Sequence, residues 1–155
     1  MPRRFNHMEL TLPKGALEKA RGEIATFYGD LFGWDAIDVP ILKQTGLLLR
    51  SDAETSQFIL LTEQRAHMSS PGFDHLGLLC DSRAEVDALL ARAKDWQRRD
   101  ARVEIKEYED LVTGAVTTHA FYVRFLLPIW FDVQVIEYAE GAGPERRWSY
   151  GSANA

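Results

Sequence analysis

Hydrophobic residues recur every three or four positions in two stretches of the chain, a spacing that predicts two amphipathic helices. The first stretch has its apolar face at Leu17, Ala20, Ile24, Phe27 and Leu31, and Gly33 is a natural C-terminal stop. The second is predicted to span residues 83–98. It opens with Ser82 and Glu85 at capping-box spacing.

Each predicted helix is followed by three runs rich in apolar and β-branched residues, separated by Gly, Pro, Asp and Ser, a pattern typical of strands. The predicted strands are residues 34–39, 45–51 and 57–62 in the first half, and 102–108, 115–126 and 130–138 in the second. A further strand-like alternation precedes each helix. The order is therefore βαβββ, twice, which predicts an α+β fold.

The two halves also match at several positions when the chain is aligned with itself at an offset of 68 residues. Phe5 pairs with Phe73, His7 with His75 and Leu10 with Leu78, so a Phe-x-His-x-x-Leu pattern opens both halves. We expect one domain over residues 1–155 with modules at about 5–63 and 73–138. Residues 139–155 are expected to form a tail.

Composition narrows the classes of function. The 155 residues are 46% hydrophobic and 26% charged, with a formal net charge of −5, and the basic residues form no continuous stripe. Nucleic acid is therefore not an expected partner. The longest apolar run, 125–131, is too short to cross a bilayer, the N-terminus lacks a signal-peptide pattern, and the single Cys80 cannot form an intrachain disulfide. We expect a cytoplasmic protein that does not bind membranes.

Two sequence segments carry a family resemblance. Residues 27–34, FYGDLFGW, and residues 73–78, FDHLGL, resemble the first helix end and the second module's opening strand of vicinal-oxygen-chelate proteins. That superfamily includes glyoxalases, bleomycin-resistance proteins and extradiol dioxygenases, and the resemblance covers roughly residues 5–138. It implies two βαβββ modules whose mixed sheets curl around a shared pocket, a small-molecule ligand and a homodimer.

The resemblance also implies a divalent metal ion, Fe, Mn, Ni or Zn, with ligands on the first and last strand of each module. The first strands offer His7 and His75, whose neutral imidazoles suit such metals. On the last strands the family's acidic position falls on Leu60, which cannot ligate, and on Gln134, which binds metal more weakly than a carboxylate does. Glu137 is a rival third ligand, although strand phase places it with the helix-facing residues. A metal-free pocket is the alternative.

Further residues are candidates for binding or proton transfer. Asp132 shares a strand face with Gln134 and is a candidate general base or ligand, and Glu137 is a second proton carrier. Tyr122 and Arg124 alternate onto one strand face and could bind a substrate anion, and we group His119 with them. Phe58, Leu60 and Trp130 are candidate pocket walls. For each of these, the alternative is a rim, core or solvent-facing residue.

These observations lead to two hypotheses of function. The first is a metal-assisted lyase, isomerase or dioxygenase of a small oxygenated substrate, in which His7 and His75 hold the metal. The second is a metal-free small-molecule binding protein that resembles bleomycin-resistance members, and Leu60 and Gln134 favour it. Phosphate loops, Cys-x-x-Cys pairs and serine-hydrolase elbows do not occur in the sequence.

Overall fold

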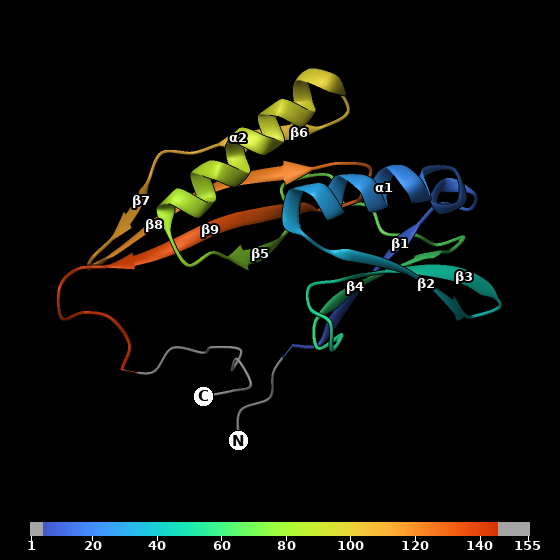
Figure 1. The fold of residues 1–155 in the computed structure, drawn as a ribbon, viewed down its shortest axis with the longest axis horizontal. Coiled ribbons are helices and arrows are strands. Elements are labelled where there is room, and N and C mark those ends of the chain that lie inside the picture. Colours follow the sequence, from blue (N-terminus) through green and yellow to red (C-terminus); the bar gives the residue numbers. More distant parts are fainter. Residues whose placement is uncertain (1–4, 146–155) are drawn as a thin grey trace.

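The structure, a computed structural model, describes residues 5–145 and contains two consecutive modules of one helix and several strands each (Figure 1). The first module comprises β1 (His7–Leu12), α1 (Ala16–Phe32), β2 (Asp35–Ile41), β3 (Gln44–Arg50) and β4 (Phe58–Glu63). The second comprises β5 (His75–Leu79), α2 (Arg83–Arg99), β6 (Glu104–Glu107), β7 (Leu111–Thr113), β8 (Val116–Arg124) and β9 (Trp130–Tyr138).

Each module forms its own mixed sheet. The first sheet has the order β1-β4-β3-β2 and the second the order β5-β9-β8-β6, with β7 paired to β8. In both sheets the opening strand runs parallel to the closing one, β1 to β4 and β5 to β9, and the other pairings are antiparallel. The two helices lie on the same side of the molecule, above the sheets (Figure 1). This repeated architecture confirms the α+β fold expected from the sequence.

Local sequence explains the element ends. Ser82 accepts a hydrogen bond from the Glu85 amide at the start of α2, as the capping spacing predicted. Gly33 ends α1 with a φ of 71°, in the left-handed region that glycine adopts without strain. One strand was not expected. The short β7 pairs with the start of β8 through the Thr113–Gly114 turn, where Gly114 has a φ of 61°.

The core continues from one module into the other. Tyr28 on α1 is fully buried, and its ring lies 5.3 Å, centroid to centroid, from that of Phe131 on β9. Its hydroxyl donates to the Phe125 carbonyl at 3.0 Å and accepts from the Phe125 amide at 3.3 Å. Burial and this hydrogen bonding join the first helix to the second module.

The N-terminus of α1 is capped by a residue distant in sequence. The Glu63 carboxylate, at the end of β4, accepts hydrogen bonds from the amides of Gly15, Leu17 and Glu18 at 2.7–3.1 Å. Partial burial opposes ionisation of Glu63, but these three donors hold its pKa below the ordinary value. Gln44 fixes the backbone of Glu63 by bonding both its N–H and its carbonyl.

Neither helix within residues 5–145 is long and apolar enough to cross a membrane.

Candidate functional site

The face of the second sheet that is turned away from α2 carries two polar residues of β9, Asp132 and Gln134. Phe131, Val133 and Val135 belong to the hydrophobic core, so the alternation of a strand directs Trp130, Asp132 and Gln134 to the opposite side. We call that side the far face. The register places Tyr122 of β8 on one side of Asp132 and Gly77 of β5 on the other. The assignment of Asp132 and Gln134 to one strand face agrees with the strand phase inferred from the sequence.

Asp132 is a buried carboxylate with incomplete hydrogen bonding. Asp132 is 8% exposed, and its Oδ1 atom has no hydrogen-bond partner within the described residues. Burial raises the pKa of Asp132, and the neighbouring His75 offsets part of that rise. A carboxylate in this environment is a better proton acceptor than an exposed one, which is a property of general bases.

His75 lies beside this carboxylate on β5. Its Nε2 atom is 3.8 Å from Asp132 Oδ2, and its Nδ1 atom is 2.8 Å from the Phe73 carbonyl oxygen. A carbonyl can only accept a hydrogen bond, so Nδ1 carries a proton and Nε2 of the neutral ring holds a lone pair. The Nε2 lone pair therefore faces the Asp132 carboxylate across 3.8 Å, a distance longer than a hydrogen bond.

Tyr122 completes this group. Its ring centroid lies 4.7 Å from that of His75 and 4.8 Å from that of Tyr108. Burial raises the pKa of Tyr122, and the negative charge of Asp132 raises it further. The phenol consequently stays protonated at neutral pH and remains a hydrogen-bond donor.

Gly77 leaves room for the side chain of Gln134. A Cβ atom on Gly77 would lie 3.1 Å from Gln134 Nε2, so the amide rests directly against the β5 backbone. Gly77 also borders the cavity described below. The absence of a side chain at this position therefore leaves space for the Gln134 amide on the far face and for the cavity.

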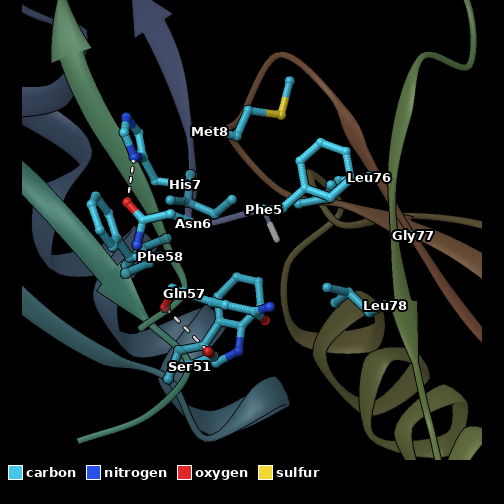
Figure 2. Close-up of a pocket in the computed structure, with 13 residues that line it drawn as sticks. Phe5, Asn6, His7, Met8, Ser51, Gln57, Phe58, Leu76, Gly77 and Leu78 are labelled. Carbon is cyan, nitrogen blue, oxygen red and sulfur yellow. Dashed lines mark hydrogen bonds between the residues drawn. The ribbon is translucent and has the colours of Figure 1, made fainter. Parts of the chain in front are cut away.

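A cavity of about 400 Å³ lies between the two modules. β1 and β4 residues, among them His7 and Phe58, line one side, and Leu76, Gly77 and Leu78 of β5 line the other (Figure 2). Most of the remaining lining is apolar and includes Trp34 and Phe5. The His7 ring stacks on Phe58 at 4.9 Å, and His7 Nδ1 lies 2.8 Å from Asn6 Oδ1. The shape and lining suit a small, largely apolar molecule.

No family model and no curated protein matches the sequence. Solved structures do match. A lactoylglutathione lyase from Agrobacterium tumefaciens aligns with a TM-score of 0.57 and 18% identity over 86% of this chain and 94% of its own. The fosfomycin resistance protein FosX from Listeria monocytogenes aligns with a TM-score of 0.54 and 15% identity over 87% and 94%.

The chain has the glyoxalase fold. This finding confirms, at the level of architecture, the resemblance drawn from residues 27–34 and 73–78. At these identities the match concerns the fold, and the chemistry must be argued from the residues of this chain.

The glyoxalase fold places the residues predicted as metal ligands in two separate environments. His7 contacts Asn6 and Phe58 on the first module, whereas His75 contacts Asp132 and Tyr122 on the second. In the described part of the chain, no group of three or more His, Cys, Asp or Glu side chains is arranged to hold a metal ion. Among the described residues, these four residue types therefore supply no three-ligand centre by themselves.

Glu137 and His119 lie on the α2 side of the second sheet. Glu137 pairs with Arg83 at 2.5 Å, and this contact keeps its pKa below the ordinary value. Burial lowers the pKa of His119, but its hydrogen bonds with Asp110 and Asp87 outweigh that effect and raise it. Both side chains belong to a charged network that ties α2 to β8 and β9.

Arg124 and two of the three predicted wall residues, Trp130 and Leu60, lie on the two sheets. Arg124 forms two hydrogen bonds with Glu104, at 2.8 and 3.0 Å, and its guanidinium lies 4.5 Å from the Trp130 ring centroid. Its charge is thus already paired. Trp130 is on the far face, and Leu60 is a buried residue of the first sheet.

Sequence reasoning did not single out Gly77, Phe73, Tyr108 or Lys106, all of which surround the far-face residues. Phe73 and Gly77 had a signal, because both belong to the segment 73–78 that carries the resemblance. Lys106 becomes visible through its register with Tyr122, and Tyr108 through its ring contact with Tyr122.

Proposed function

We propose that the protein is an enzyme that transfers a proton on a small oxygenated substrate, as a lyase or isomerase. The observation that carries this proposal is the buried Asp132 carboxylate, which has an unpartnered oxygen and faces the His75 Nε2 atom. A structural carboxylate at this depth would normally be fully hydrogen-bonded. A carboxylate oxygen without a hydrogen bond lowers the stability of the fold, but it leaves the carboxylate able to accept a proton as a general base does.

The far face supplies the parts of such a reaction. Asp132 accepts a proton from the carbon beside a substrate carbonyl, and the electron pair of the broken C–H bond moves into an enolate. The Tyr122 hydroxyl donates a hydrogen bond to the enolate oxygen. The proton on Asp132 then returns to the same carbon, which gives exchange or epimerisation. Alternatively it goes to the former carbonyl carbon while the proton of the substrate's neighbouring hydroxyl passes to the enolate oxygen, which completes the isomerisation.

An isotope-exchange assay tests this proposal without knowledge of the natural substrate. The protein is incubated in D₂O with a panel of small hydroxyketones, hydroxyaldehydes and 2-oxo acids, and deuterium at the carbon beside the carbonyl is followed by NMR. We expect enzyme-dependent exchange with at least one class, and its loss in Asp132→Asn. Asp38→Asn is the matched control, because Asp38 is an exposed residue of the first sheet and forms an ion pair with Arg21. Exchange that survives Asp132→Asn would refute the assignment of the base.

The metal-assisted form of this function stays a prediction. Glyoxalase-fold proteins of the vicinal-oxygen-chelate type often use a divalent ion, for which His7, His75 and Gln134 are the candidate ligands in this chain. Because the described His, Cys, Asp and Glu side chains form no group of three that could hold a metal, we derive no step through one. Calorimetric titration of metal-stripped protein with Fe(II), Mn(II), Ni(II) and Zn(II), compared with His75→Ala, measures whether a site exists.

A second candidate function, metal-free binding of a small apolar compound, is favoured by the cavity between the modules. Its walls include Trp34, Phe58 and Leu76, and the aromatic rings of the first two can stack on planar ligands. Leu78→Trp would fill the cavity from β5. We expect this variant to remove thermal stabilisation by any aromatic compound that stabilises the wild type, while Val112→Trp, at an exposed position of β7, leaves it unchanged.

We also propose a homodimer. β1 and β5 are both edge strands, each paired on one side only, and Leu79 on β5 is 71% exposed. Open edges and exposed apolar residues favour association with another chain. Sedimentation equilibrium of wild type and Leu79→Lys tests this, with a shift toward monomer expected in the variant.

A further inference from the structure

Lys106 is a half-buried cation on the far face that lacks an anionic partner. Its ammonium lies 3.6 Å from the Phe73 ring centroid and 5.0 Å from that of Tyr108. Lys94 on α2, by contrast, pairs with Glu107 at 2.8 Å. Among residues 5–145, no carboxylate lies within ion-pair distance of the Lys106 ammonium. The aromatic rings hold this charge in place but leave its N–H donors without an acceptor.

The register of the second sheet aligns Lys106 with the proposed reacting groups. Lys106 is paired with Tyr122, Tyr122 with Asp132 and Asp132 with Gly77, so the four positions form one row across β6, β8, β9 and β5. The lysine ammonium contacts the ring of Phe73, which lies two residues before β5, so the two side chains meet over this face of the sheet. The Tyr122 ring is in turn 6.4 Å from that of Phe73 and 4.7 Å from that of His75, so the lysine, the tyrosine and the histidine belong to one group of neighbouring side chains.

The other cation of the far face is already neutralised. Arg124 binds Glu104 through two parallel hydrogen bonds, the arrangement in which a guanidinium satisfies a carboxylate most fully. The protein as a whole carries a formal charge of −5, which repels anions. An anionic ligand at this face therefore needs a cation of its own, and within residues 5–145 Lys106 is a far-face cation without an ion-pair partner.

We propose that Lys106 binds the anionic group, a carboxylate or a phosphate, of the substrate on which Asp132 and His75 act. This inference rests on the proposed function and narrows its substrate class to small carbonyl compounds that carry a negative charge. Adjacent strands are about 4.8 Å apart, so Lys106 and Asp132 are separated by two strand spacings, and the long lysine side chain shortens that span. The anionic group and the reacting carbon would be a few bonds apart.

Binding measurements on two matched pairs of probes test this inference. Pyruvate and hydroxyacetone differ by a carboxylate, and dihydroxyacetone phosphate and dihydroxyacetone differ by a phosphate. Each is titrated into ¹⁵N-labelled protein, and dissociation constants are taken from amide shifts. The variants are Lys106→Met, Lys106→Arg and, as a control with the same change of charge, Lys94→Met.

We expect at least one anion to bind more tightly than its neutral counterpart and to lose on the order of tenfold or more in affinity in Lys106→Met. Lys106→Arg should retain most of that affinity, Lys94→Met should match the wild type, and the neutral probes should be unaffected by all three changes. The anion that responds identifies the carboxylate or the phosphate as the recognised group.

Two outcomes would overturn the inference: neither anion shows Lys106-dependent binding into the tens of millimolar, or Lys94→Met weakens binding as much as Lys106→Met. Both readouts concern binding alone. An anion that binds through Lys106 without deuterium exchange would contradict the proposed enzyme while leaving this site intact.

Discussion

Replacing Asp132 with asparagine should make the fold more stable at neutral pH while removing the proposed activity. The wild-type carboxylate is 8% exposed and its Oδ1 atom lacks a partner among the described residues, so ionisation there is unfavourable. Asparagine has nearly the same shape and carries no charge. The variant therefore removes the cost of ionising this group and changes little else.

The magnitude follows from the cost of a buried polar group without a partner, about 1–3 kcal/mol. Asparagine still buries a polar amide, and His75 already offsets part of the cost, so we expect a gain of about 1–2 kcal/mol. For a chain of this size each kcal/mol corresponds to a rise in Tm of about 2–4 °C.

The pH dependence identifies the cause. The pKa of Asp132 in the folded protein is raised above its ordinary 3.8, so the folded state holds this proton to higher pH than the unfolded state does. Wild type and variant should be equally stable below that ordinary value. Their difference should grow as the pH rises through the folded pKa and then level off.

Scanning calorimetry of both proteins from acid to neutral pH measures this difference, and Asp38→Asn serves as a control with little expected effect. A variant that is less stable than wild type at neutral pH would refute the reasoning. It would mean that the carboxylate makes stabilising contacts, and the argument for a general base would lose its physical support.

Four further outcomes are expected. Tyr28→Phe should lower the unfolding free energy by about 1–3 kcal/mol in urea titrations, because a buried backbone amide loses its partner; an unchanged midpoint would contradict the link between the modules. Gly77→Ala should displace the Gln134 amide, so the rate of deuterium exchange should fall while the Tm changes little; an exchange rate equal to that of the wild type would argue against a role for that amide. His119 has a raised pKa in the fold, so the stability it contributes, measured against His119→Gln by thermal unfolding, should be full below pH 6.5 and decline as the pH rises through the folded pKa; a constant difference would rule this out. Finally, turnover of the methylglyoxal–glutathione adduct in a spectrophotometric assay should be negligible, since the family resemblance aligns Leu60 and Gln134 with the positions where a four-ligand glyoxalase has carboxylates.

The fold was predictable because local patterns and the repeat agree with each other. Helical spacing, the Ser82 cap and the Gly33 stop located the helices, and strand alternation located most strands. The same alternation correctly separated Asp132 and Gln134 from Glu137 on β9, because side-chain direction along a strand has a period of two.

The site was less predictable because it depends on pairing between strands distant in sequence. Lys106 belongs to a four-residue strand with little hydrophobic pattern, and only its register with Tyr122 brings it to the far face. The repeat that equates His7 with His75 says nothing about the angle between the two sheets. The histidines match in sequence and yet have different neighbours.

The capping of α1 by Glu63 has a consequence for the order in which the first module forms. The amide of Leu17 obtains its partner from a residue 46 positions later, so the helix start cannot be completed until β4 is in place. During synthesis from the N-terminus, α1 would emerge with a frayed first turn. In the mature protein, amide exchange at Leu17 and Glu18 should report the opening of β4 rather than local fluctuation of the helix.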